Sequence, residues 1–252
     1  MGARRILAMG GGGFQMDLDD PQLDDYLLSL PGVARPRICL LPTASGDADR
    51  VIRRYFDRFL TAACEPTYLG LFARRVEDLR AFLLAQDLVY VSGGNTANML
   101  AVWRAHGVDA ILREAWSRGV VLAGLSAGSL CWFEDGVTDS FGRGLGPLGD
   151  GLGFVLGSHC PHYDGEARRR PTYTQLVQEG GLKPGHALDD GAALLFEGTA
   201  IVDAVRSIPS ARAFLVEPGE REARETPIPL RDLPSNRIDL PGVASDPARR
   251  RG

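Results

Sequence analysis

The sequence predicts an α/β protein built on a mostly parallel, doubly wound sheet with helices on both faces. In the first half of the 252-residue chain, short apolar runs alternate with segments of helical periodicity. Elements that alternate at this length are typical of parallel strands connected by helices. Glycine-rich stretches beginning at Gly10, Gly93 and Gly124 each follow or end a predicted strand. Because sites in such sheets form at the carboxyl ends of strands, these stretches indicate where a site lies.

The first half contains the clearest elements. Residues 49–63 show the strongest helical pattern, with apolar side chains along one side: Val51, Ile52, Tyr55, Phe56, Phe59 and Leu60. Strands are predicted at 5–9, 37–41, 67–71, 87–91 and 120–123. Further helices are predicted at 76–84, 96–104 and 108–118, with a helix-like run at 130–133.

The second half is richer in glycine and more strand-like. We predict a strand within 152–160, a helix over 167–179 and two strands or a hairpin within 192–206. Prolines and charges dominate from Pro227 onward. No repeat or linker interrupts the pattern. The expected organisation is therefore a single α/β domain over residues 1–235, followed by a loosely ordered tail over 236–252.

Composition limits the kinds of partner. The formal net charge is −4 and no basic stripe precedes the arginine-rich end, so we expect no nucleic-acid partner. No apolar run approaches membrane-spanning length, and the stretch 6–9 is too short for a signal sequence. The four cysteines show no CxxC spacing, which favours buried thiols. We expect a cytoplasmic protein without a membrane partner. No sequence feature reports an interface, so a homo-oligomer is left open.

The segment Gly124-Leu-Ser-Ala-Gly128 fits the pattern G-x-S-x-G. It follows an apolar strand and precedes a helix-like run, which is the context of a nucleophile elbow. Such a turn holds the serine in a strained conformation with its hydroxyl exposed, and the flanking glycines avoid collisions with neighbouring strands. Ser126 is therefore the predicted nucleophile, in preference to a serine that only caps a helix.

Backbone donors for the reacting oxygen are expected beside Ser126. One N–H comes from the residue after the nucleophile, here Ala127. Gly94, in Ser92-Gly-Gly-Asn-Thr96 at the end of a predicted strand, can supply a second N–H because no side chain blocks its approach. Asn95 either adds an amide to the site or caps the following helix.

A serine nucleophile needs a base, and the chain has four histidines. His106 precedes a glycine at a helix end, where a role in the C-terminal cap is expected. His186 follows Pro-Gly and is predicted to lie in a loop. His162 is preferred over His159 because it opens a loop, whereas His159 still lies in the strand.

The carboxylate that orients the histidine is sought among nearby acidic residues. Asp189 and Asp190 lie at a strand–turn position that suits the role, although either also suits a plain turn. Asp164 and Glu166 lie nearer to His162 in sequence and are equally explained as solvated loop charges.

Two further patterns do not support a cofactor. His159, Cys160 and His162 lie together, but zinc sites usually have a second ligand cluster, and the sequence shows none. The glycines at 10–13 are not followed by Gly-Lys-Ser/Thr, and Gln15 stands where a dinucleotide fingerprint has its last glycine. We predict no metal and no organic cofactor. The glycines are interpreted as close packing near the rim of the active site.

Together these motifs resemble the peptidase E and cyanophycinase family of serine peptidases, whose fold is similar to class I glutamine amidotransferases. The resemblance runs from the first strand to about Thr199. It rests on the segments 10–13, 92–96, 124–128, Cys160-Pro-His-Tyr163 and Leu188-Asp-Asp-Gly191. The family implies a serine–histidine–acid arrangement in that chain order, which maps onto Ser126, His162 and Asp190. It also implies backbone donors at Gly94 and Ala127.

Two departures from the family pattern bear on the acid and the substrate. Peptidase E usually has glutamate as the acid, where this chain offers Asp190. It also uses an arginine after the histidine loop to bind an N-terminal aspartate, and the matching region here, in a shifted register, holds Arg168, Arg169 and Arg170. An arginine fork suits a carboxylate, but a run of arginines is equally typical of a solvated helix face. The expected substrate-binding residues are Asn95, Arg168 and Arg169.

The predicted function is that of a serine-type exopeptidase or dipeptidase that hydrolyses short peptides through an acyl-enzyme, with N-terminal aspartate as a candidate specificity. The alternative is a non-catalytic module that binds a small metabolite on the same fold. A third hypothesis makes Cys131 or Cys160 the nucleophile, as in amidotransferases.

Overall fold

The computed structural model describes residues 3–142 and 144–234. The predicted tail at 236–252, and the last residue of the predicted domain, lie outside the described residues. Within the described ranges, no helix combines the length and apolar character needed to cross a membrane.

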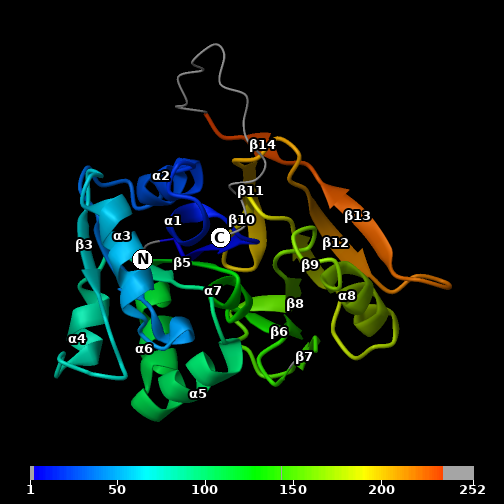
Figure 1. Ribbon diagram of the computed structural model, residues 1–252, viewed down its shortest axis with the longest axis horizontal. Helices are drawn as coiled ribbons and strands as arrows, with labels where there is room; N and C mark the ends of the chain where they lie inside the picture. Colours follow the sequence, from blue (N-terminus) through cyan, green and yellow to red (C-terminus); the bar gives the residue numbers. More distant parts are fainter. Residues whose placement is uncertain (1–2, 143, 235–252) are drawn as a thin grey trace.

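A large sheet forms one side of the molecule (Figure 1). In the described part of the chain it has eight strands, in the order β14-β11-β10-β1-β5-β4-β2-β3. The parallel strands are β1 (Arg5–Met9), β5 (Val121–Leu125), β4 (Leu88–Val91), β2 (Arg37–Leu41) and β3 (Glu65–Tyr68). β10 (Ala192–Glu197) runs antiparallel to β1, followed outward by β11 (Ala200–Arg206) and β14 (Arg231–Asp232). The predicted mostly parallel α/β fold is confirmed.

Helices cover both faces of the large sheet. Successive residues of a strand point to opposite faces, and in β1 Ile6 and Ala8 pack into one apolar cluster while Leu7 and Met9 pack into another. The first cluster includes side chains from α4 (Leu79–Leu84), α5 (Thr96–His106) and α6 (Val108–Ser117). The second includes side chains from α1 (Gly13–Met16), α2 (Gln22–Ser29) and α3 (Asp49–Phe59). The sheet is therefore doubly wound.

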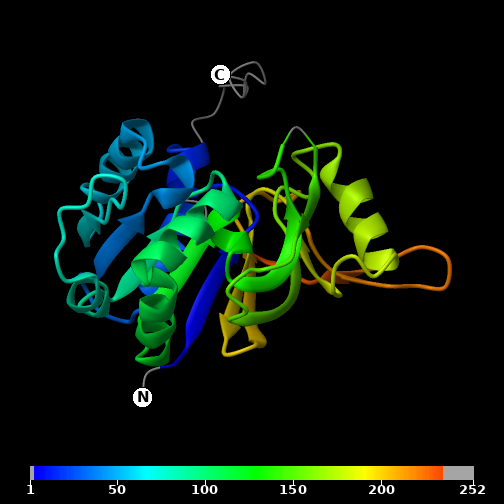
Figure 2. The same cartoon turned by 90° about the horizontal axis from the view of Figure 1, so that it is seen from below.

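A second sheet lies beside the first (Figures 1 and 2). Its strands, within the described residues, run in the order β13-β12-β9-β8-β6-β7. Their bounds are β6 (Phe133–Thr138), β7 (Gly146–Leu148), β8 (Val155–Cys160), β9 (Gly185–Leu188), β12 (Ala213–Glu217) and β13 (Arg224–Ile228). The predicted strand at the end of 152–160 and the hairpin within 192–206 are confirmed, but they belong to different sheets. Sequence patterning did not separate the two.

The second sheet is also covered on two faces. One face joins the apolar cluster of α4, α5 and α6, through residues such as Phe133 and Leu188. The other packs against α8 (Arg169–Gln178), which contributes Tyr173 and Val177 to a separate cluster on the side away from the large sheet (Figure 2). Because one core is continuous across both sheets, it supports the single domain expected for residues 1–235, which stays a prediction.

The helix after Ser126 is shorter and earlier than expected. α7 spans Ala127–Leu130, and the chain enters β6 at Phe133. The helix-like run predicted at 130–133 is therefore wrong. Its apolar side chains are buried because they enter the core between the two sheets rather than one face of a helix. All four cysteines are free and buried, as predicted.

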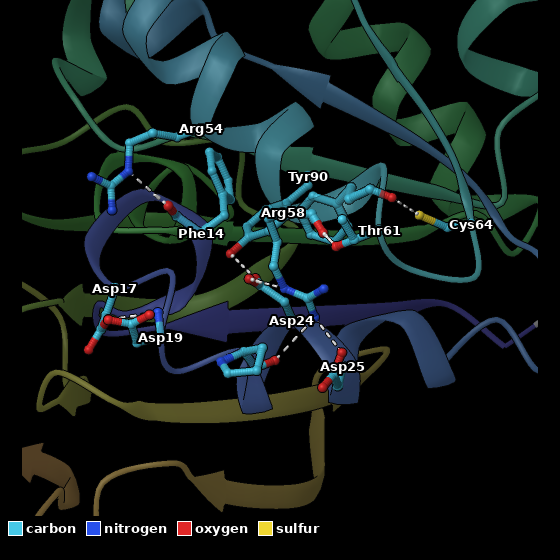
Figure 3. Close-up of polar contacts among 12 residues, drawn as sticks. Phe14, Asp17, Asp19, Asp24, Asp25, Arg54, Arg58, Thr61, Cys64 and Tyr90 are labelled. Carbon is cyan, nitrogen blue, oxygen red and sulfur yellow. Dashed lines mark hydrogen bonds and ion pairs between the residues drawn. The ribbon is translucent and has the colours of Figure 1, made fainter. Parts of the chain in front are cut away.

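A buried ionic cluster supports the turn after β1 (Figure 3). Asp24 on α2 is fully buried, and its Oδ2 lies 3.3 Å from Nε of Arg58 on α3. The Tyr90 hydroxyl donates to Asp24 Oδ1 at 3.2 Å, and Arg58 also pairs with the more exposed Asp25. Burial raises the pKa of Asp24 to about 7, although the charge of Arg58 opposes this shift. A carboxyl group in this setting makes stability depend on pH.

Asp24→Asn is expected to flatten the pH dependence of stability. Because the pKa of Asp24 is about 7 in the folded protein and ordinarily 3.8, the folded state keeps a proton that the unfolded chain releases. The contribution to stability is thus full below about pH 4 and is lost as the pH rises to about 7, with a limiting slope of ~1.4 kcal/mol per pH unit. Urea unfolding over this range measures the slope. Asp25→Asn is the control and should keep it; equal slopes in wild type and Asp24→Asn would contradict the prediction.

Candidate active site

The segments that carry Ser126, Gly94 and Asp190 meet at one edge of the large sheet. Parallel strands end at the same edge, so the segments after β1, β4 and β5 lie together there. β10 runs the opposite way, and the pairing of Met9 with both Leu125 and Ala193 places the start of β10 at this edge as well. The turn before β10 carries Asp190, which explains how residues far apart in sequence reach one place.

Ser126 occupies a strained turn between β5 and α7. Its backbone φ is +54° and ψ is −117°, a conformation that side-chain-bearing residues rarely adopt. The flanking glycines are required by space: a Cβ at Gly124 would lie 2.1 Å from Gly128 O, and one at Gly128 would lie 2.4 Å from Val91 O. Ser126 is partly exposed while its neighbours are buried. The turn therefore has the geometry predicted from the G-x-S-x-G pattern.

His162 and Asp190 are in direct contact. His162 Nδ1 and Asp190 Oδ1 lie 2.6 Å apart, with 14% and 25% of the respective side chains exposed. His162 also has a positive φ, +53°. The backbone N–H of His162 donates to Gly10 O at 3.2 Å, while the backbone N–H of Ser126 donates to the adjacent carbonyl, Met9 O, at 3.3 Å. The histidine and the serine are thus both anchored to the end of β1.

Glycines make room for this contact. A Cβ at Gly11 would lie 2.1 Å from Asp190 Oδ1 and 2.9 Å from His162 Nδ1. A Cβ at Gly165 would lie 2.5 Å from Asp190 Oδ2. The glycine-rich stretch after β1 therefore packs closely against the site, which is the interpretation given to it from the sequence. The lack of side chains at Gly11 and Gly165 leaves room for the Asp190 carboxylate beside the ring.

The other acidic candidates have different partners. Asp189 is buried, and its Oδ2 accepts hydrogen bonds from Arg212 N and Nε at 2.9 and 3.1 Å. Burial raises the pKa of the Asp189 carboxyl. Glu166 pairs with Arg169 at 2.8 Å. Asp164 Oδ1 accepts the N–H of Asp190 at 2.9 Å, so it supports the turn that carries Asp190.

The remaining histidines are structural. His159 is fully buried between Ser129 Oγ, 2.7 Å from Nε2, and His186 O, 2.9 Å from Nδ1. Because a carbonyl only accepts, Nδ1 carries the proton and Nε2 accepts from Ser129. Burial lowers the pKa of His159 to about 3 and that of His186 to about 4. His186 lies in β9 and not in the predicted loop, because its ring packs on aromatic core residues. His106 ends α5 as predicted.

Gly94 follows β4 and Ala127 follows Ser126, and their predicted role as oxyanion donors stays a prediction. Gly94 has φ +144°, and a Cβ there would lie 2.1 Å from Ala44 O, so only glycine fits. Ala127 is the first residue of α7, directly after Ser126. Among the described residues, neither backbone N–H donates to another protein group.

Asn95 is committed to the local structure. Its Oδ1 accepts the Asn98 N–H at 2.8 Å and caps α5, so the cap predicted as one of its two roles is confirmed. Its Nδ2 donates to Ser140 O at 3.0 Å. Ser140 Oγ in turn accepts the N–H of Thr96 at 3.0 Å. Asn95 thus ties the loop after β6 to the end of β4, and its amide is engaged on both sides.

The two candidate arginines differ in their surroundings. Arg169 is buried, pairs with Glu166 and donates to Val137 O at 3.3 Å. This placement assigns Arg169 to holding the segment after His162. Arg168 is exposed and lines a surface hollow of about 320 Å³ with residues that include Asp139 and Glu166. Of the two arginines, Arg168 is the one exposed to solvent.

The cysteines do not support the thiol hypothesis. Cys131 and Cys160 are fully buried. Burial raises the pKa of both thiols far above the usual value, whereas a thiol nucleophile reacts as the thiolate. Within residues 3–142 and 144–234, no three His, Cys, Asp or Glu side chains form a group that could hold a metal ion.

Sequence reasoning did not assign Gln15, Asp164 or Gly165 to the site. Gln15 contacts Gly93, and the other two contact Asp190. Asp164 and Gly165 lie directly after the histidine segment, but the turn they meet is more than twenty residues away in sequence. The only sequence signal at Gln15 was its position after a glycine-rich stretch. These roles depend on contacts between segments, which a single sequence does not specify.

A strained serine after a central parallel strand, with a carboxylate-bound histidine anchored to the same sheet edge, is typical of α/β proteins of the serine-hydrolase class. Comparison with known proteins narrows this class. Residues 6–203 match the model of peptidase family S51. The chain is 49% identical over 232 residues to an "Uncharacterized peptidase YgaJ" of Bacillus subtilis (strain 168), covering 91% of this chain and 99% of that protein. The chain therefore belongs to peptidase family S51, a family of serine-type peptidases.

Solved structures share the fold. A "Putative Peptidase E Protein" from Listeria monocytogenes EGD-e superposes with a TM-score of 0.61 at 18% identity, covering 81% of this chain and 98% of that one. A peptidase from an acI-B1 Actinobacterium gives a TM-score of 0.59 at 17% identity, covering 90% and 95%. The resemblance to the peptidase E family is confirmed, and with it the assignment as a peptidase.

Proposed function

We propose that this protein is a serine exopeptidase that hydrolyses short peptides through a Ser126–His162–Asp190 arrangement. The observation that carries the proposal is the 2.6 Å contact between His162 Nδ1 and Asp190 Oδ1, beside a serine held in a strained turn. The Nδ1 proton is donated to the carboxylate, so Nε2 is left with a lone pair to accept the serine proton. A buried network built only for stability has no need of a strained serine at its edge.

The reaction runs in two stages. Ser126 Oγ attacks the scissile carbonyl while its proton passes to His162 Nε2, and the carbonyl oxygen becomes an oxyanion held by the N–H groups of Gly94 and Ala127. His162 then returns the proton to the leaving amine, the C–N bond breaks and an ester to Ser126 remains. Water, deprotonated by His162, attacks the ester; His162 then returns this proton to Ser126 Oγ as the ester bond breaks and the acid product leaves. Asp190 stabilises the histidine cation formed in each stage.

Arg168 is the residue proposed to bind an acidic side chain at the N-terminus of the peptide. It is exposed at the hollow that it lines with Asp139 and Glu166, on the segment that follows His162. A guanidinium fork binds a carboxylate with paired hydrogen bonds. Arg169 and Asn95 are engaged in the fold, so they support this specificity only by holding the neighbouring segments in place.

Hydrolysis of a dipeptide panel tests the function and the specificity together. Wild type is expected to cleave Asp-X peptides in preference to peptides with neutral or basic N-terminal residues. Arg168→Met should lower kcat/KM for Asp-X by about 10- to 100-fold, mainly through KM, and leave neutral peptides unchanged. Arg74→Met, at another exposed arginine, is the matched control. Equal cleavage of all peptides would remove the role of Arg168. Saturable binding without turnover would favour the metabolite-binding module.

We also propose the cytoplasm as the working compartment. The four cysteines are free and buried, and unpaired cysteines are usual where thiols are kept reduced. The proposed mechanism needs no cofactor and is therefore compatible with the cytoplasm.

A further inference from the structure

Gln15 makes two hydrogen bonds to Gly93, which precedes the proposed oxyanion donor Gly94. Its Oε1 accepts the N–H of Gly93 at 2.8 Å, and its Nε2 donates to Gly93 O at 3.4 Å. The side-chain amide therefore pairs with the backbone of Gly93 much as a neighbouring strand would. Gln15 is the residue at which the glycine-rich stretch departs from a dinucleotide-binding pattern, and the mechanism above gives it no role.

We propose that Gln15 is a positioning residue that fixes the orientation of the 93–94 peptide and so aims the Gly94 N–H at the oxyanion. The inference rests on the proposed function of Gly94. Gly93 C=O and Gly94 N–H belong to one trans peptide unit, in which the two groups point in opposite directions. Holding the carbonyl toward Gln15 therefore turns the Gly94 N–H away from Gln15 and keeps it free of protein acceptors.

The segment needs such a restraint. Two consecutive glycines have the widest backbone freedom of any dipeptide, so rotation of the peptide between them meets little steric resistance. Gly94 already has φ +144°, outside the range of other residues. Gly93 also packs on the nucleophile, since a Cβ there would lie 3.2 Å from Ser126 Cβ. A shift of Gly93 would disturb the oxyanion donor and the serine together.

α1 is itself held firmly, which gives Gln15 a fixed base (Figure 3). Phe14, next to Gln15, is fully buried with edge-to-face contacts to Tyr55 and Tyr90, at ring-centroid distances of 5.6 and 5.1 Å. Arg54 Nε donates to Phe14 O at 3.1 Å. The buried pair of Asp24 and Tyr90 lies under the turn that begins α1. Phe14 thus anchors the short helix in the core while Gln15 reaches the loop after β4.

A positioning role predicts a specific kinetic signature. An oxyanion donor acts in the transition state, so misorienting it lowers kcat and leaves KM nearly unchanged. Removing one such donor outright lowers rates by about 10²- to 10³-fold, so loosening its aim should cost about 10- to 100-fold. Affinity for a peptide aldehyde, which forms the tetrahedral adduct, should fall by the same factor.

Two substitutions separate orientation from general support. Gln15→Met keeps the length of the side chain and removes both hydrogen bonds. Gln15→Glu keeps an oxygen that accepts the Gly93 N–H, which is the shorter of the two hydrogen bonds. It loses the donor to Gly93 O and places a second carboxylate oxygen next to that carbonyl, where the two oxygens repel each other. If Gln15 only supports the fold, Glu should be the milder change; if it orients the peptide, both variants lose kcat by about 10-fold or more. Gln22→Met on α2, whose amide bonds Asp20 at 3.0 Å, is the matched control and should keep wild-type kinetics.

The test combines steady-state kinetics, aldehyde inhibition and thermal unfolding with a crystal structure of Gln15→Met. The proposal is supported by a lowered kcat, an unchanged KM and a rotated or disordered 93–94 peptide in a folded variant. Unchanged kcat, or lowered kcat with the peptide still in place, overturns it. If wild type hydrolyses none of the peptides, the proposed function fails. The crystal structure still decides whether Gln15 sets the peptide orientation, and a peptide that keeps its orientation overturns the inference.

Discussion

Ser126→Ala is expected to lower kcat/KM for the best dipeptide by about 10⁴-fold or more, with the chain still folded. Without the hydroxyl no acyl-enzyme forms, and only the oxyanion donors and substrate binding remain to assist direct attack by water. The methyl group of alanine replaces a partly exposed hydroxymethyl group that makes no hydrogen bond to the described part of the chain. Substrate binding, measured by calorimetry on the inactive variant, should be retained.

Ser126→Gly is the informative companion. Serine and alanine both strain the turn at φ +54°, ψ −117°, whereas glycine adopts this conformation freely. Ser126→Gly should therefore be equally inactive but more stable than Ser126→Ala by about 1 kcal/mol. Urea unfolding of the two variants measures the difference. Full turnover by Ser126→Ala would show that another group is the nucleophile, and equal stability of the two variants would show that the turn stores no strain.

The large sheet could be predicted because its strands carry strong local signals. β1, β2, β4 and β5 are apolar and nearly fully buried, and each is followed directly by glycine, proline or serine. The second sheet could not be separated from the first, since strands such as β6, β7 and β8 mix buried with exposed residues and lack a uniform apolar signal. Which sheet a strand joins depends on long-range pairing, such as β6 with β8 and β8 with β9, and a single sequence records none of it.

In the candidate site, too, some residues carry local sequence signals while others depend on contacts between distant segments. The strained turn at Ser126 has a local signature, G-x-S-x-G after an apolar strand, so its conformation could be predicted from sequence; the segment around Gly94 carries only a weak local signal, and its role stays a prediction. The choice of Asp190 over Asp189 could not be derived from the residues. It depends on alternation: Asp189 turns inward to Arg212, while Asp190 turns outward to His162. Arg168 and Arg169 divide in the same way, because one faces solvent and the other packs under the loop.

Asp190→Asn is expected to lower kcat by about 10³- to 10⁴-fold while leaving the site in place. Asparagine is nearly the same size, so it fits between Gly11 and Gly165 as aspartate does. Its amide nitrogen can donate to His162 Nδ1, which places the ring proton on Nε2. A protonated Nε2 cannot accept the proton of Ser126, so the nucleophile is not activated. Steady-state kinetics measure the loss, and the ring-nitrogen NMR shifts of His162 report the change of tautomer.

Asp189→Asn gives the matched control, because it makes the same substitution one residue earlier. Asp189 faces Arg212, and an asparagine oxygen can still accept the Arg212 N–H that it holds at 2.9 Å. We therefore expect kcat within about 3-fold of wild type, since no charge next to His162 is lost. If the two variants lost activity equally, the loss would reflect damage to the turn before β10 rather than the histidine contact. A selective loss in Asp190→Asn assigns the orienting carboxylate to the residue whose side chain turns toward the ring.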